Sequence, residues 1–219
     1  MIEKAIASCK MILNAVFDYL FYLPFGGEAA FRRTCMDFIP LTDGDALLEL
    51  CCGVGEFTAV LARQKTAGRL VGVDISGPSI ESAGRRLRYT KAGFLLASAA
   101  DLPFSSGTFE KCVVSFGMHH MPMQERTKSL KEMHRILVRE GKLYIFDYRL
   151  PENCIKKLAA IAYTHLDSSK EAYRMMISGS LFSEIEDAGF EIVRQGFTCY
   201  GIVQLLEIRK NRRHGLSIP

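Results

Sequence analysis

The nine residues LLELCCGVG, from Leu47 to Gly55, decide the fold of this chain. An apolar run of strand length carries an acidic residue, Glu49, and leads into a turn with Gly53 and Gly55 that opens a helical stretch at Glu56. Glycine removes the side chain where backbone must approach a ligand, and a helix start offers unpaired N–H groups. The stretch therefore predicts a buried strand and a turn suited to a nucleotide-like ligand.

The next apolar run, residues 70–73, ends in Asp74, which lies 25 positions after Glu49. A carboxylate about 20 residues on from such a turn accepts hydrogen bonds from ribose hydroxyls. Two plainer interpretations stay open: Asp74 caps the helix that begins near Pro78, and the two glycines only make a tight turn. Their joint placement after the first two strands favours an adenosine ligand.

Outward from this stretch, short apolar runs alternate with helical segments. The expected strands span residues 46–50, 70–73, 94–97, 112–115 and 143–146, and the expected helices span residues 56–64, 79–89 and 123–139. A helix over residues 181–188, closed by Gly189, precedes two adjacent runs at 190–198 and 202–208, which predict an antiparallel hairpin. The pattern indicates an α/β fold with a Rossmann-like, doubly wound, seven-stranded sheet that is mainly parallel.

Two helices are expected before this sheet. Apolar residues recur with helical spacing over residues 2–20, and a second helical run covers residues 28–38. The first helix either packs on the core or serves as a lid or interfacial helix. Because Glu3, Lys4, Lys10 and Asp18 interrupt its apolar residues, neither a signal peptide nor a membrane span is expected.

Composition narrows the class of protein. With 48% hydrophobic and 24% charged residues, the 219-residue chain is expected to be one globular domain rather than disordered. Seven cysteines without a CxxC spacing favour a reducing, cytoplasmic setting. The net charge of +4 equals the excess supplied by Arg209, Lys210, Arg212 and Arg213, so we expect no nucleic-acid partner. This cluster is either a solvated tail or a peripheral contact with anionic lipid.

From about residue 40 to residue 209 the chain resembles the class I S-adenosylmethionine-dependent methyltransferases. LLELCCGVG is similar to their first motif, and Asp74 to their ribose-binding acid. ASAADLPFSSGTFEKCVVSFGMHHM (97–121) and LKEMHRILVREGKLYIF (130–146) resemble the stretches through their fourth and fifth strands. DAGFEIVRQGFTCYGIVQL (187–205) looks most like the ubiquinone and menaquinone C-methyltransferase branch.

The resemblance implies S-adenosylmethionine as the cofactor and three parts of the chain: a helical cap (1–40), a cofactor-binding core (41–150) and an acceptor side with the hairpin (151–219). The implied cofactor-binding residues are Glu49, Cys51, Gly53, Gly55, Asp74, Ile75, Ser98, Ala99 and Ser115. Glu49 would hold the methionine ammonium, Asp74 the ribose hydroxyls, and Ser98 with Ala99 the adenine. Two positions depart from the family: Cys51 replaces a glycine, and Ser98 replaces an aspartate whose role Asp101 could take.

Methyl transfer from a sulfonium is a direct displacement that needs alignment, exclusion of water and, for a ring carbon or phenol, a base. The candidate catalytic residues are His119, His120, Asp147 and Tyr148, and the alternative is that they shape the pocket. Tyr163 and His165 are either acceptor-side residues or ordinary helix packing. Cys51 and Cys52 are poor nucleophile candidates because no covalent adduct is needed.

The fourth strand is followed by Ser115, Phe116 and Gly117 instead of the Asp/Asn-Pro-Pro-aromatic motif of enzymes that methylate nucleobase amines. A small aromatic or lipophilic acceptor, such as a quinone precursor, is therefore expected, without a metal. Another small metabolite, or a non-catalytic scaffold of the same fold, remains the alternative. A homodimer also stays open.

Overall fold

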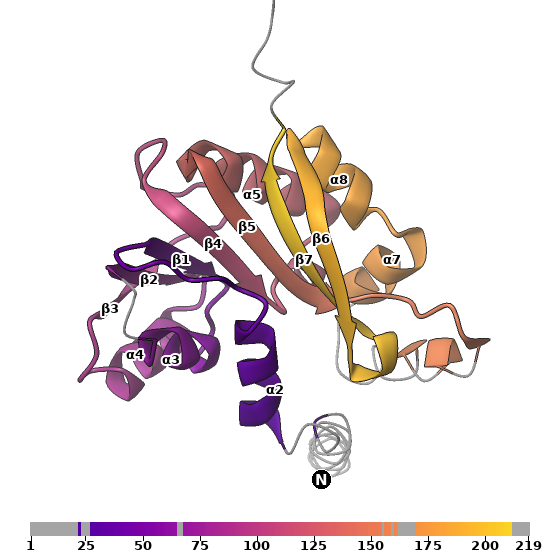
Figure 1. The fold of residues 1–219 in the computed structure, drawn as a ribbon, viewed down its shortest axis with the longest axis horizontal. Coiled ribbons are helices and arrows are strands. Elements are labelled where there is room, and N and C mark those ends of the chain that lie inside the picture. Colours follow the sequence, from indigo (N-terminus) through magenta and orange to yellow (C-terminus); the bar gives the residue numbers. More distant parts are fainter. Residues whose placement is uncertain are drawn as a thin grey trace, which may run out of the picture.

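The computed structural model describes residues 22, 27–64, 68–154, 156–158, 160–161 and 170–211. Its strands are β1 (Ala46–Leu50), β2 (Arg69–Asp74), β3 (Ala92–Leu96), β4 (Phe109–Ser115), β5 (Leu137–Tyr148), β6 (Phe190–Thr198) and β7 (Val203–Lys210). They form one seven-stranded sheet in the order β3-β2-β1-β4-β5-β7-β6 (Figure 1). All neighbouring pairs are parallel except those of β7, which is antiparallel to β5 and β6. The predicted fold class is confirmed.

Helices cover both faces of the sheet. The described helices are α2 (Glu28–Met36), α3 (Glu56–Ala62), α4 (Gly77–Arg86), α5 (Met123–Ile136), α7 (Lys170–Ser178) and α8 (Leu181–Asp187), with 3-10 turns η2 (Met118–His120) and η3 (Cys199–Gly201). In Figure 1, α5 and α8 lie behind β4–β7. Residues of α2 and α3 pack on the other face of the sheet. Three parts of the sequence analysis fall outside the described residues: the helix predicted over residues 2–20, the candidate residues Tyr163 and His165, and the basic residues Arg212 and Arg213.

The hydrophobic core has two parts because successive strand residues point to opposite faces. Leu48 and Leu50 of β1 belong to the part that contains Leu130 and Met133 of α5. Leu47 belongs to the other part, with the aromatic and apolar residues of α2 and α3. Burial on both faces explains why β1 reads as a continuous apolar run.

Several predicted boundaries differ from the observed ones, and the difference is clearest between α5 and β5. The helix expected to continue to residue 139 ends at Ile136, and Leu137 is the first residue of a twelve-residue β5. Leu137 pairs with Phe109, and the register then shifts before Lys142 pairs with Lys111. Leu137 is fully buried, so its apolar character suits a strand as well as the helical stripe of Leu130 and Met133, and periodicity alone does not distinguish them.

The connections out of β1 and β4 run in opposite directions along the sheet, because β2 and β3 lie on one side of this pair and β5 on the other. In doubly wound sheets, the crevice at such a reversal, beyond the carboxyl ends of the strands, is where ligands bind. Cys51, Asp74 and Phe116 occupy or follow those ends. Among the described helices, none is long and apolar enough to cross a membrane.

Candidate functional site

The loop after β1 has an unusual backbone. Cys51, Gly53 and Gly55 have φ values of 56°, 52° and 79°, all in the left-handed region. Gly55 precedes α3, and a Cβ there would lie 3.0 Å from the Cβ of Ala83 in α4. Gly53 has nothing within 4 Å of such a Cβ, so its backbone angle, rather than crowding, requires glycine. Gly55 therefore allows α3 and α4 to pack closely, while Gly53 allows the left-handed turn of the loop.

Asp74 ends β2 with both carboxylate oxygens bound to backbone. The N–H of Gly53 donates to Oδ2 (2.8 Å) and the N–H of Ser76 donates to Oδ1 (2.9 Å). The side chain that caps α4 is that of Ser76, whose Oγ accepts from the N–H of Ser79 at 3.4 Å. Asp74 is therefore not the α4 cap, and each carboxylate oxygen keeps a lone pair for a further donor.

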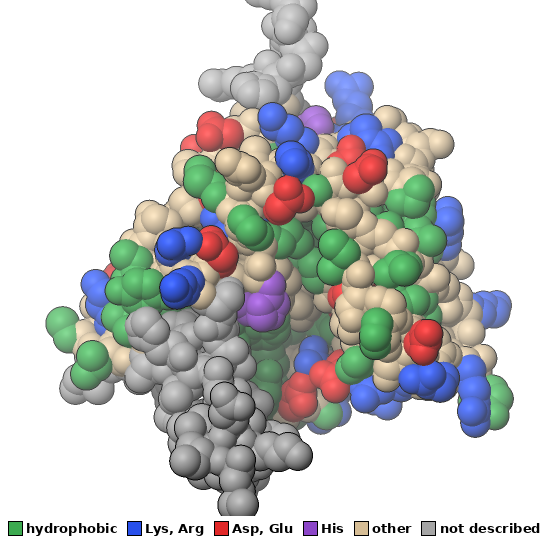
Figure 2. Space-filling model, turned by 180° about the vertical axis from the view of Figure 1, so that it is seen from behind, with side chains coloured by type: hydrophobic (Ala, Val, Ile, Leu, Met, Phe, Trp, Pro, Cys, Tyr) green, Lys and Arg blue, Asp and Glu red, His purple; other side chains and the backbone are tan. Residues whose placement is uncertain are grey.

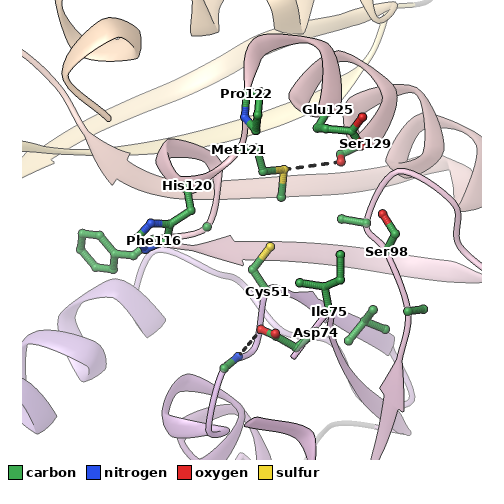
Figure 3. Close-up of a pocket in the computed structure, with 15 residues that line it drawn as sticks. Cys51, Asp74, Ile75, Ser98, Phe116, His120, Met121, Pro122, Glu125 and Ser129 are labelled. Atoms are coloured by element: carbon green, nitrogen blue, oxygen red, sulfur yellow. Dashed lines mark hydrogen bonds between the residues drawn. The ribbon is translucent and has the colours of Figure 1, made fainter. Parts of the chain in front are cut away.

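These groups meet at a cavity of about 490 Å³. Seven of the predicted site residues line it: Cys51, Gly53, Asp74, Ile75, Ser98, Ala99 and His120. In Figure 3, Cys51, Asp74 and Ile75 form one wall, and the chain from His120 to Ser129 forms the wall facing them. The volume falls within the usual range for small-ligand and cofactor sites.

Several wall residues are ones that sequence reasoning did not single out as site residues: Val73, Ala97, Phe116, Gly117, Met121, Pro122, Glu125 and Ser129. Gly117 is the clearest, because a Cβ there would lie 2.6 Å from the Cβ of Cys51. Phe116 has a φ of 55°, which turns the chain at the end of β4. Apart from the predicted His120, the signal in the sequence for this wall was a glycine two residues after the end of an apolar strand.

Six predicted residues do not line this cavity: Glu49, Gly55, Ser115, His119, Asp147 and Tyr148. The side chain of Glu49 is 1% exposed and accepts a hydrogen bond from the Thr58 hydroxyl. Burial raises the pKa of Glu49 to about 8, and the Thr58 bond opposes that rise without cancelling it. Glu49 is thus buried in β1 and largely protonated at neutral pH.

Asp147 anchors the η2 turn. Its Oδ2 accepts from the N–H groups of Met118 (2.9 Å) and His119 (3.2 Å), and its Oδ1 accepts from the N–H of Tyr148 (2.7 Å). Oδ1 also lies 2.7 Å from Nδ1 of His119, which is 1% exposed. The ring centroids of His119 and His120 are 3.9 Å apart, and His120 alone of the two faces the cavity.

The thiol of Cys51 reaches into the cavity between Asp74 and Met121 (Figure 3). Burial, together with the nearby carboxylates, raises the pKa of this thiol to about 12. A thiol with that pKa stays protonated at neutral pH and is a poor nucleophile. The side chain therefore serves as part of the apolar wall.

Residues 47–141 match the methyltransferase domain family. The chain is 27% identical to an uncharacterised methyltransferase of Synechocystis over 90% of its length and 91% of the relative's. It is 28% identical to the ubiquinone/menaquinone biosynthesis C-methyltransferase of Haemophilus ducreyi, over 84% of this chain and 78% of that one. A 2-phytyl-1,4-naphtoquinone methyltransferase of Thermosynechococcus vestitus is 31% identical over 59% of this chain and 58% of its own length.

Solved structures share the fold at lower identity. A Pyrococcus horikoshii protein superposes with a TM-score of 0.64 at 19% identity, covering 77% of this chain and 83% of that one. A SAM-dependent methyltransferase of Aquifex aeolicus gives 0.63 at 16% identity, covering 80% and 87%.

The sheet order defines a Rossmann-like α/β fold, and the paired turn and carboxylate lie in the wall of a cavity that is a candidate small-ligand site. More narrowly, residues 47–141 are a methyltransferase domain, so the class of enzyme is a methyltransferase.

Proposed function

We propose that the 490 Å³ cavity holds S-adenosylmethionine and that this enzyme methylates a small aromatic, lipophilic acceptor of the quinone-precursor class. The observation that carries the cofactor assignment is the Asp74 carboxylate, held in the cavity wall by the N–H groups of Gly53 and Ser76. A fixed acceptor pair of this kind suits two vicinal ribose hydroxyls. The rest of the wall fits the same ligand.

The wall on either side of Asp74 suits a purine. Ile75 lies in the cavity wall and is 76% exposed, so a flat ring bound there would cover an apolar side chain. Ser98 and Ala99 border the same space, and the Oγ of Ser98 accepts from the N–H of Ala100 at 3.2 Å. The Ser98 hydroxyl proton thus remains available for a ring nitrogen.

Glu49 and Ser115 are proposed to act from the margin of the cavity. Glu49 lies directly before the loop and, once ionised, would attract the methionine ammonium group from below Cys51. A bound ammonium would favour loss of the Glu49 proton, whose pKa of about 8 lies close to neutrality. Ser115, at the end of β4, is proposed to lie near the sulfonium.

The acceptor is proposed to bind beyond Phe116 and His120. Phe116 lies in a chain of aromatic contacts, 5.9 Å from Phe31 and 5.2 Å from Tyr148 between ring centroids. Hydrophobic side chains also occupy the middle of the face in Figure 2, around a hollow beside a histidine. An aromatic, lipophilic acceptor would stack well in such surroundings.

The bound cofactor supplies an electrophilic methyl group on a sulfonium. His120, in the cavity wall, is the residue proposed to remove the proton from the acceptor's hydroxyl or ring carbon. His119 and Asp147 are positioning residues, since Asp147 holds the turn that carries both histidines. Tyr148 packs against the His119 ring with centroids 4.7 Å apart and helps to exclude water.

The decisive test is methyl transfer from [methyl-³H]S-adenosylmethionine to a reduced, prenylated demethyl-naphthoquinone, with Asp74→Ala as the matched variant of weakened cofactor binding. In parallel, cell extract is labelled and separated into lipid, small polar and RNA fractions. We expect label in the quinol and in the lipid fraction. Label only in the polar fraction or only in RNA would refute the acceptor class, and binding of cofactor with no transfer to any fraction would identify a scaffold.

A further inference from the structure

Arg126 of α5 and Glu184 of α8 form a buried, two-pronged ion pair behind the cavity. The guanidinium Nε donates to Glu184 Oε2 and Nη2 donates to Oε1, both at 2.7 Å. Arg126 is 3% exposed and Glu184 is 2% exposed. The hydroxyl of Ser180 donates to Glu184 Oε1 at 2.7 Å, which fixes the carboxylate further.

The same guanidinium also binds the cavity wall. Its Nη1 donates to the carbonyl of Met121 at 2.7 Å, and the backbone N–H of Arg126 donates to the carbonyl of Pro122 at 3.0 Å. Met121 and Pro122 both line the cavity and face Cys51 and Asp74 across it (Figure 3). The Ser129 hydroxyl donates to Met121 Sδ at 3.5 Å, so this side chain is held as well.

At the other end of the segment, Asp147 holds the N–H groups of Met118 and His119. The wall from Gly117 to Pro122 is thereby fixed at both ends by side chains from outside it. Arg126 therefore links α8 to this wall, through Glu184 and through the Ser180 hydroxyl at the start of α8, which lies 3.4 Å from Nη2.

We propose that Arg126 is a positioning residue for cofactor binding, and that Glu184 acts through it. Arg126 holds the carbonyl of Met121 so that Met121 and Pro122 close the cavity opposite Asp74. Replacing a buried ion pair by apolar residues of similar size often leaves a fold as stable as before or more so. Apolar residues cannot replace the hydrogen bond to the Met121 carbonyl. A positioning role for Arg126 therefore predicts weaker cofactor binding without a loss of stability, whereas a purely structural role does not.

This inference rests on the assignment of the cavity to the cofactor, and the test distinguishes the two. Calorimetric titration with S-adenosylhomocysteine is performed on the full chain and on the Arg126→Met/Glu184→Met double variant, with the urea midpoint measured for each. We expect the midpoint to be retained and the Kd to rise about five- to tenfold, the loss of roughly one hydrogen bond. The KM for S-adenosylmethionine should rise more than kcat falls.

Two further variants complete the design. Arg126→Lys keeps a charge against Glu184. A single ammonium nitrogen cannot reproduce the three contacts that three separate guanidinium nitrogens make to Glu184 and the Met121 carbonyl, so the Kd should also rise, even if the double variant does not fold. The control is Asp45→Asn/Lys111→Met, which removes another buried ion pair, one that does not touch the cavity. It should lower the urea midpoint and leave the Kd unchanged.

A folded double variant, or Arg126→Lys, that binds as tightly as the parent would overturn the positioning role. An equal rise in Kd for the Asp45/Lys111 control would do the same, because the effect would then follow from stability alone. If Asp74→Ala binds normally, it is the cofactor assignment that fails.

Discussion

At the scale of single residues, Asp74 joins the two halves of the site. Its carboxylate ends β2, yet its Oδ2 binds the N–H of Gly53 in the loop after β1. The loop and the second strand are therefore fixed to each other before any ligand arrives, so a ligand does not have to order them. An Asp74→Ala change removes a partner for a ligand and also frees the loop.

Glu49 gives the protein an unusual dependence on pH. Its folded-state pKa of about 8 lies above the ordinary value of 4.5, so between these values the folded chain holds a proton that the unfolded chain has released. Stability must therefore fall as pH rises through this window. We expect Glu49→Gln, which keeps a side-chain acceptor for Thr58, to lose less stability than the parent between about pH 5.5 and about pH 7.5.

Urea unfolding at these two pH values measures the effect, with the parent and the variant compared in the same buffers. Other titrating groups contribute equally to both chains and cancel in the difference. Parallel pH slopes for the two proteins would show that Glu49 is already ionised in the fold.

Gly117 and Cys51 form a second pair of coupled residues. A Cβ on Gly117 would lie 2.6 Å from the Cβ of Cys51 and 2.9 Å from Cγ1 of Val114. We expect Gly117→Ala to destabilise the fold by about 1–3 kcal/mol through overpacking. Adding Cys51→Gly should recover part of this loss, since it removes one clash and relieves the left-handed φ of 56°.

Thermal or urea unfolding of the single and double variants tests this coupling. Gly84→Ala is the matched control, because a Cβ at Gly84 in α4 meets nothing within 4 Å. If the two changes are simply additive, residues 51 and 117 are not in contact in solution.

Residue identities predicted one side of the site well and the other poorly. Gly53, Asp74, Ile75, Ser98 and Ala99 were predicted from motifs within or after strands, and all line the cavity. The facing wall comes from a 3-10 turn and the first turns of α5, whose side chains point in directions that neither a period of 2 nor one of 3.6 predicts. The roles of all these residues stay predictions until a ligand is bound.

At the scale of elements, η2 separates two neighbouring histidines. His119 turns inward to Asp147, while His120 turns to the cavity. The sequence alone did not distinguish the two histidines, because the side of the three-residue turn that each one faces depends on Asp147. This residue belongs to β5 and lies 27 residues further along the chain than His120. Tertiary contact, rather than local pattern, makes them different.

This difference predicts unequal effects of substitution. His120→Gln should lower kcat about a hundredfold if this imidazole removes the acceptor's proton. His119→Gln should lower it less, because His119 acts through His120. The rate of methyl transfer measured as a function of pH tests both variants. The rise in rate that accompanies deprotonation of the general base should be lost only in His120→Gln. A larger defect in His119→Gln, or an unchanged profile in His120→Gln, would reverse the assignment.

Element boundaries were predictable where local signals are strong. The predicted strand at 46–50 and the predicted strand at 190–198 coincide with β1 and β6. The α5–β5 junction was misplaced because the chain passes from helix to strand at Leu137 without an intervening loop. A buried leucine satisfies both patterns, and only pairing with Phe109 in β4 decides between them.

At the scale of the whole molecule, the last three strands are joined by a charged cluster. Glu207 of β7 is 6% exposed and binds Lys142 of β5 and Arg194 of β6, the latter at 2.9 Å from Nε. Burial opposes ionisation of Glu207, but these two cations more than compensate and lower its pKa. The carboxylate therefore stabilises the sheet while it is charged.

Because this pKa is lowered, the stabilisation is present above the ordinary pKa of 4.5 and is lost as pH falls through the folded-state pKa. Glu207→Gln should destabilise the fold by about 1–2 kcal/mol at pH 7, and the difference from the parent should shrink in acid. Urea unfolding across this range tests the sign. A difference that grows on acidification would contradict it.

The central claim is that the cavity beside Asp74 holds S-adenosylmethionine, and isothermal titration of the full chain with S-adenosylmethionine tests it most directly. The parent should bind one equivalent, and Asp74→Ala should bind more weakly by about 1–3 kcal/mol. Glu81→Ala, which removes an exposed carboxylate of α4 outside the cavity wall, should bind like the parent. Absence of binding by the parent, or equal binding by Asp74→Ala, would contradict the account.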